Sequence, residues 1–106
     1  MAWIYLIIAG LLEIGWAIGI KYAKGWTRPI PSVLTIAAMI VSFYLLAQAV
    51  RTLPIGTGYA IWTGIGAAGA AIAGMILFKE PATAGRLICI ALILAGIVGL
   101  RITSPD

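Results

Sequence analysis

The residue of this sequence best suited to chemistry is Glu13, in the motif LLEIGW. It is the only charged residue between Ala2 and Ile20, in a stretch of leucine, isoleucine, alanine, glycine and aromatic residues. A charge near the centre of a bilayer costs at least about 2.5 kcal/mol on insertion scales, so intramembrane carboxylates tend to be functional. We interpret Glu13 as a carboxylate whose counter-ion arrives from outside, either a proton or a cationic substrate. The alternative is a protonated Glu13 that hydrogen-bonds a neighbouring helix.

The helical period identifies the side chains that share a face with Glu13. Residues three, four and seven positions away lie on the same side of a helix. On both adjoining turns this face contains small residues, among them Gly10, and Trp16 stands one turn away. The small residues leave room for a ligand, so we expect Gly10 to line a cavity beside the carboxylate.

Polar side chains also occur inside the second and third apolar segments, where we single out Ser42, Tyr59 and Trp62. In hydrocarbon, a hydroxyl or an indole N–H needs a polar partner, and Glu13 is the only strong acceptor among these segments. We therefore expect these groups and Trp16 to orient the carboxylate, and the aromatic rings to face a cation. Simple packing is the competing interpretation of each aromatic residue taken singly.

The stretch GIGAAG, residues 64–69, matches the dinucleotide fingerprint G-x-G-x-x-G. That fingerprint binds a pyrophosphate only where a strand turns into a helix, and this stretch lies inside an apolar segment with no acidic ribose ligand after it. We expect no cofactor. Gly64 and Gly66 instead predict close helix contact or a helix bend.

Small residues also recur in the last apolar segment and form a surface for helix packing: Ala91, Ala95, Gly96 and Gly99. One chain of four short helices can hardly enclose a cavity across a bilayer. We therefore expect at least a dimer, with this segment in the contact and one Glu13 supplied by each subunit.

The composition identifies the environment of these residues. Of 106 residues, 63% are hydrophobic and 9% are charged, far below the charged fraction of soluble domains, so the chain is predicted to be an integral membrane protein. The net charge of +4 comes from residues at segment ends, where they meet lipid headgroups, and we expect no nucleic-acid partner. Without histidine and with one cysteine, no disulfide or Cys/His metal site can form within the chain.

Four segments are long enough for a helix to cross a bilayer, which takes about 20 residues. They cover about 2–20, 31–50, 57–78 and 84–102, and predict an all-α, single four-helix transmembrane domain over residues 1–106. The amino terminus lacks a basic region and a cleavage site, so we expect the first segment to be retained. The first and third loops carry five basic residues, against Arg51 and Arg101 elsewhere, which favours outward-facing termini.

Over essentially its whole length, the chain resembles the small multidrug resistance family of bacterial inner-membrane transporters. The resemblance rests on GLLEIGWAI around Glu13, on the loop KYAKGWTRPIPS, and on LPIGTGYAIWTGIG from Leu53 to Gly66. Within the family it is similar to the guanidinium exporter subtype rather than the quaternary-ammonium subtype, through five residues that occur together: Gly10, Trp16, Ser42, Tyr59 and Trp62.

The resemblance implies proton-coupled export of guanidinium-type cations by an antiparallel homodimer embedded in membrane lipid. The two Glu13 carboxylates would bind either protons or substrate. Ser42, Trp16, Tyr59 and Trp62 would hold the glutamates, while Met39 and Phe43 would line a portal toward lipid.

Other functions stay open on the sequence alone. One is an exporter of quaternary ammonium or other hydrophobic cations. Another is a proton-conducting or assembly subunit of a membrane complex, since such subunits also place one carboxylate in a small apolar chain, although they are normally helical hairpins. An enzyme is not expected, because the segments contain no nucleophile–base pair and no metal-ligand set.

Overall fold

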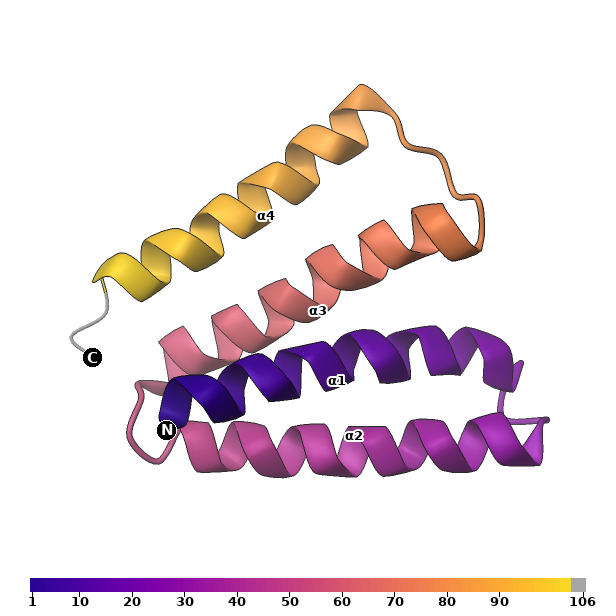
Figure 1. Cartoon of the computed structure of the whole chain (residues 1–106), viewed down its shortest axis with the longest axis horizontal. Coiled ribbons are helices and arrows are strands. Elements are labelled where there is room, and N and C mark those ends of the chain that lie inside the picture. The colour runs from indigo at the N-terminus through magenta and orange to yellow at the C-terminus, as the bar shows by residue number, and fades with distance from the viewer. Residues whose placement is uncertain (104–106) are drawn as a thin grey trace.

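The computed structural model describes residues 1–103, which form four helices joined by short loops. They are α1 (Ala2–Ala23), α2 (Pro29–Ala49), α3 (Ile55–Leu77) and α4 (Ala84–Thr103) (Figure 1). Each helix is long and apolar enough to cross a membrane. The prediction of an all-α fold with four spans is confirmed.

The observed helix ends lie within three residues of the predicted spans, and the largest difference is at the end of α1. This helix continues through Lys21 to Ala23 and ends where Lys24 adopts a left-handed backbone conformation, with φ at 49°. The next helix begins at Pro29, whose fixed φ and missing N–H suit a first helical turn. Hydropathy thus locates the apolar interior of a helix better than its polar last turn.

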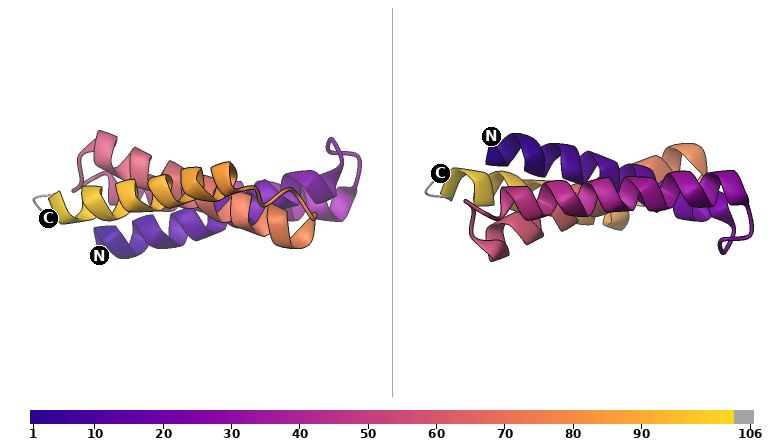
Figure 2. Two further views of the ribbon diagram at one scale, coloured as in Figure 1. Left: turned by 90° about the horizontal axis from the view of Figure 1, so that it is seen from above. Right: turned by 90° about the horizontal axis from the view of Figure 1, so that it is seen from below.

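The helices form a thin layer in the order α2, α1, α3, α4 (Figure 1 and Figure 2). The extents are 43 × 34 × 16 Å, and a helix with its side chains is about 10–12 Å across. Within the described chain, α1 packs between α2 and α3, whereas α4 packs mainly against α3. It also reaches α1 through Arg101, whose guanidinium carbon lies 4.4 Å from the ring centroid of Trp3. Both broad faces of the layer are therefore open to lipid or to another protein chain.

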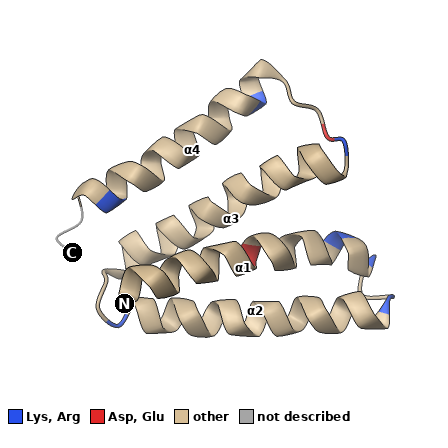
Figure 3. Ribbon diagram, in the orientation of Figure 1, with Lys and Arg blue, Asp and Glu red and all other residues tan. Residues whose placement is uncertain are grey.

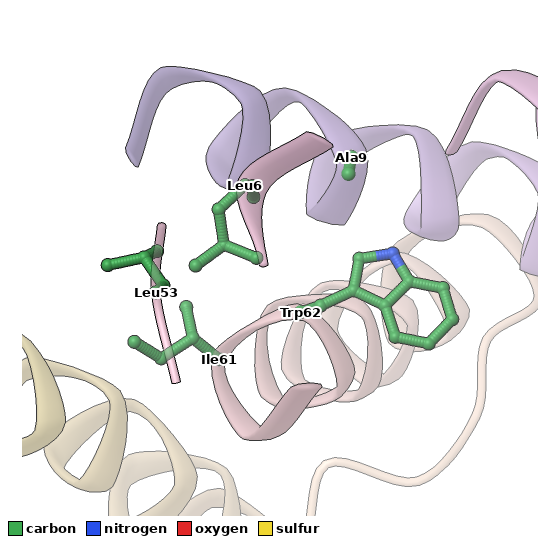
Figure 4. Packing of buried hydrophobic residues seen from close by; sticks show 6 residues of the cluster. Leu6, Ala9, Leu53, Ile61 and Trp62 are labelled. Atoms are coloured by element: carbon green, nitrogen blue, oxygen red, sulfur yellow. The ribbon is translucent and has the colours of Figure 1, made fainter. Parts of the chain in front are cut away.

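A small apolar core joins the first three helices near the end of the layer that carries the N-terminus (Figure 4). It consists of six buried residues: Leu6, Ala9, Ala49, Leu53, Ile61 and Trp62. The last helix contributes only partly buried side chains, Ile97 and Leu100, at the edge of this cluster. The core thus fixes α1, α2 and α3 relative to one another more firmly than it fixes α4.

Glycines bring α1 and α3 into close contact on both sides of Glu13. A Cβ atom at Gly10 of α1 would lie 2.8 Å from Cγ2 of Ile65. In the opposite direction, a Cβ atom at Gly69 of α3 would overlap the side chain of Ile14. A branched side chain from each helix therefore occupies the space left by a glycine on the other, which sets the register between the two helices.

Candidate functional site

The middle of α1 carries an acidic side chain, while lysines and arginines lie at helix ends and in loops (Figure 3). That side chain is Glu13, which is partly buried. Its Oε1 atom is buried and has no hydrogen-bond partner among residues 1–103. The carboxyl group lies against Gly66 of α3, at the place that a Cβ atom of residue 66 would occupy. Glu13 therefore points toward α3 and is held there by packing.

A buried hydrogen-bonded chain lies one turn from Glu13. The Ser42 hydroxyl of α2 donates to the backbone carbonyl of Ala9 at 2.7 Å, and it accepts a hydrogen bond from Trp62 Nε1 at 3.0 Å. The side chain of Ser42 is fully buried. In a regular helix the Ala9 carbonyl also accepts the backbone N–H of Glu13, because the two residues are four positions apart. Ser42 and Trp62 thus connect to the backbone that carries the glutamate.

Four aromatic rings form a continuous series from α1 through α2 to α3. The ring centroids of Trp16 and Phe43 are 6.2 Å apart, those of Phe43 and Trp62 are 5.6 Å apart, and those of Trp62 and Tyr59 are also 5.6 Å apart. These separations are typical of favourable tilted and edge-to-face pairs. Phe43 therefore bridges the two predicted site residues Trp16 and Trp62.

Hydrogen bonds from these residues to the carboxylate stay a prediction. In the described part of the chain, Ser42 and Trp62 bond to Ala9 and to each other, and Trp16 Nε1 is buried without a partner. Tyr59 lies at the far end of the aromatic series, with 55% of its surface exposed. The structure thus brings the four aromatic rings together as one series and joins Ser42 and Trp62 to the α1 backbone one turn before Glu13. The carboxyl group itself lies against Gly66.

The remaining predicted positions have more varied surroundings. Gly10 is buried against Ile65, and Gly64 faces Ile97 of α4, while α3 runs without a break through Gly64 and Gly66. Met39 is partly buried and Phe43 is 46% exposed. The roles of these residues in a cavity, a bend or a portal stay predictions.

The predicted packing surface on α4 lies away from Glu13. Ala91, Ala95 and Gly96 are exposed, Gly99 is partly so, and a Cβ atom at Gly96 or Gly99 would meet no described atom within 4 Å. This surface is thus uncovered by residues 1–103, and its role in a dimer stays a prediction.

Thr63 is not among the site residues predicted from the sequence. Its Oγ1 atom is buried in α3 without a hydrogen-bond partner in residues 1–103, although a helical threonine can bond to its own backbone. Thr63 precedes Gly66 by one turn, so it shares the face of α3 that receives Glu13. The sequence does contain a signal for this residue, because a hydroxyl in the interior of an apolar span needs a polar partner.

Comparisons with known proteins identify relatives of the whole chain. The sequence model of the family described as Small Multidrug Resistance protein matches residues 1–93. A guanidinium exporter of Citrobacter freundii is 60% identical over 104 residues, which cover 98% of this chain and 99% of the relative. Guanidinium exporters of Salmonella typhimurium (strain LT2) and Yersinia pseudotuberculosis are each 56% identical over 104 residues. The match covers 98% of this chain in both cases, and 99% and 100% of the relatives.

These matches agree with the four apolar helices and confirm the family resemblance that was inferred from the motifs around Glu13 and Trp62. The chain is a multi-pass protein of the bacterial inner membrane and belongs to the small multidrug resistance family of transporters.

Proposed function

We propose that this protein exports guanidinium and small guanidinyl cations in exchange for protons, and that Glu13 of each protomer in a homodimer binds both. The substrate class is supported by the relatives, which are named guanidinium exporters. The site is supported above all by one observation, the buried Glu13 Oε1 atom with no hydrogen-bond partner in the described chain.

That oxygen needs a partner from outside the chain. A buried polar atom left without a hydrogen bond destabilises a protein by about 1–3 kcal/mol, and a charged one by more. A proton or a cation satisfies it, and only one of them can do so at a time. Glu13 is thereby suited to a site that exchanges one cation for the other.

The chemistry of guanidinium matches a carboxylate. Like the head group of arginine, it remains cationic at physiological pH, so it crosses lipid poorly and needs a carrier. Its planar edge can donate two parallel hydrogen bonds to one carboxylate. A quaternary ammonium has no N–H to donate, so it would rely on charge and on the aromatic rings alone.

The aromatic series and the buried serine define the wall of this site. The rings of Trp16 and Trp62 offer faces that attract a cation, and Phe43 joins them. Ser42 and Tyr59 supply hydroxyls beside this wall. With Met39, the half-exposed ring of Phe43 lines an opening through which an alkyl or aryl group of a substituted guanidine can extend into lipid.

A second copy of the chain completes the site. One protomer forms a thin layer whose broad faces are open, and the small residues of α4 have no partner in residues 1–103. Pairing of two layers covers Glu13 and brings two carboxylates to one cavity. We propose the antiparallel arrangement because the family resemblance implies it, and because two inverted protomers can exchange roles when the cavity changes sides.

Exchange of guanidinium for protons follows if the two compete for the same Glu13 carboxylates. If protons and guanidinium occupy the same two carboxylates, and the dimer changes sides readily only when these are occupied, each guanidinium moved outward returns protons inward. An empty pair of buried carboxylates holds two like charges, which disfavours that state during the change of sides.

Liposomes that contain only this protein test the proposal. A guanidinium gradient should drive protons in the opposite direction, detected by an internal pH dye, and Glu13→Gln should abolish the signal. Absence of guanidinium-driven proton movement by the unaltered protein would contradict the proposal. Stronger coupling to tetraphenylphosphonium than to guanidinium would instead identify an exporter of bulky hydrophobic cations.

A further inference from the structure

We infer that Gly66 is a positioning residue for Glu13: its missing side chain forms the space in α3 that seats the carboxyl group. This inference rests on the proposed function of Glu13, and it gives Gly66 a role different from a helix bend. A Cβ atom built at Gly66 would overlap the carboxyl carbon and Oε1 of Glu13 and would lie 2.6 Å from its Cγ atom. Real Cβ atoms do not approach other heavy atoms so closely, so an alanine at this position must displace the glutamate.

Packing, rather than hydrogen bonding, holds the carboxylate at this place. Glu13 Oε1 has no partner in the described chain, and the nearby hydroxyl of Ser42 is already engaged by Ala9 and Trp62. A carboxylate without donors is free to rotate unless its surroundings restrict it. The contact with α3 supplies that restriction and leaves the hydrogen-bonding capacity of the oxygen to a ligand.

The glycine contacts on either side of Gly66 give the seat its fixed position. Ile65 fills the space at Gly10, and Ile14 fills the space at Gly69, so α1 and α3 cannot slide past each other without a clash. Because Ile14 follows Glu13 directly and Ile65 precedes Gly66 directly, these contacts determine where the carboxyl group meets α3. The position of the Glu13 carboxyl group is therefore set by the register between α1 and α3 and not by a flexible loop.

The neighbouring glycine provides a matched control. Gly64 lies two residues away in the same helix, but it faces Ile97 of α4, with a Cβ-to-Cδ1 distance of 3.0 Å. If these glycines served only to bend α3, alanine at either position should have a similar effect. If Gly66 seats the glutamate, the two substitutions should differ, although alanine favours a helix equally in both.

Labelling with carboxyl-¹³C glutamate reports directly on the surroundings of the Glu13 carboxyl group, because Glu13 and Glu80 are the only glutamates of the chain. In the reconstituted dimer, Gly66→Ala should move the Glu13 signal and leave that of Glu80, while Gly64→Ala should move neither. Gly66→Ala should also weaken guanidinium binding about tenfold, as expected when a charge-assisted hydrogen bond is lost. Equal effects of the two substitutions, or an unmoved Glu13 signal in Gly66→Ala, would overturn the inference.

Thermal stability in detergent provides a second test that does not depend on transport. The atoms nearest to a Cβ atom at residue 66 would be the outer atoms of the Glu13 side chain, which can move aside, so Gly66→Ala should lower stability slightly when Glu13 is present. It should be harmless in a Glu13→Ala background, where no carboxyl group fills the space. Equal destabilisation in both backgrounds would show that Gly66 has another role. If the unaltered protein does not bind guanidinium, the proposed function fails. The ¹³C signal of Glu13, and the stability of Gly66→Ala with and without Glu13, still decide whether Gly66 positions Glu13.

Discussion

The contact between α1 and α3 and the outer surface of α4 are both rich in small residues, yet they differ in what occupies the space. At Gly10, Gly66 and Gly69, an added Cβ atom would meet a side chain of the facing helix. At Gly96 and Gly99 it would meet no atom of the described chain within 4 Å. The first set is used inside one protomer to place Glu13, whereas the second is available to another copy. The same residue type thus packs against a facing helix in one region and stays uncovered in the other, where we propose that it serves assembly.

The largest effect is expected from removing the charge at the centre of the contact between α1 and α3. Glu13→Gln keeps the shape of the side chain but cannot exchange a proton, so guanidinium-driven proton movement in liposomes should disappear. Because packing against Gly66 is preserved, the variant should still insert and dimerise, as measured by crosslinking in membranes. Proton-coupled uptake by this variant would remove Glu13 from the mechanism, and loss of the dimer would show that its charge also serves assembly.

A bulky residue on the second region should disturb assembly and leave the protomer intact. Gly96→Leu enters open space in the described chain, so it should not alter the packing of α4 on α3. If α4 packs against a partner, overpacking should cost about 1–3 kcal/mol and weaken the dimer by roughly 5- to 150-fold. Dimer dissociation followed by dilution in lipid or detergent measures this effect. Gly85→Leu is the matched control, since that glycine is also uncovered but lies at the start of α4, outside the predicted packing surface.

An effect of similar size is expected from the hydrogen-bonded chain that supports the first region. Ser42→Ala removes the donor to Ala9 and leaves the buried N–H of Trp62 without its acceptor, so stability should fall by about 1–3 kcal/mol. Guanidinium affinity should fall with it. Ser32→Ala is the control, because the Ser32 hydroxyl bonds at 2.5 Å to Arg28 beside its own helix and not to α1 or α3. Equal losses of stability in the two variants, measured by thermal unfolding, would argue against a special role for Ser42.

The smallest effect concerns the loop between the two regions. Glu80 and Arg86 form an ion pair at 2.7 Å, with each side chain about one-third exposed. Exposed or partly exposed pairs typically contribute less than about 1 kcal/mol, so Glu80→Gln should change thermal stability only slightly. Transport should persist, because this pair joins the loop after α3 to the first turn of α4 and does not lie beside Glu13. A loss of transport in Glu80→Gln would show that the loop takes part in the cycle.

The sequence predicts the four spans well because lipid exposure requires about 20 consecutive apolar residues in each. It also identifies Glu13, since an isolated carboxylate in such a span stands out. It does not predict that Ser42 bonds to the Ala9 carbonyl or that Glu13 rests on Gly66. Helical periodicity assigns residues to faces within one helix, but the rotation and register between helices depend on how side chains such as Ile14 and Ile65 fit the opposing glycines. Thr63 carries the same sequence signal as Ser42, a hydroxyl inside an apolar span, but the sequence does not reveal that its oxygen is buried on the face of α3 that receives Glu13.

A protomer that is one thin layer has two broad outer faces and only a small buried core. If the protein works as the proposed homodimer, a newly inserted copy holds Glu13 only partly buried, within lipid that cannot solvate a charge, until a second copy covers the site. We expect unpaired copies to be short-lived in the bilayer, so that the amount of working transporter depends steeply on how much chain is synthesised. Low expression would then reduce activity more than in proportion to the number of chains.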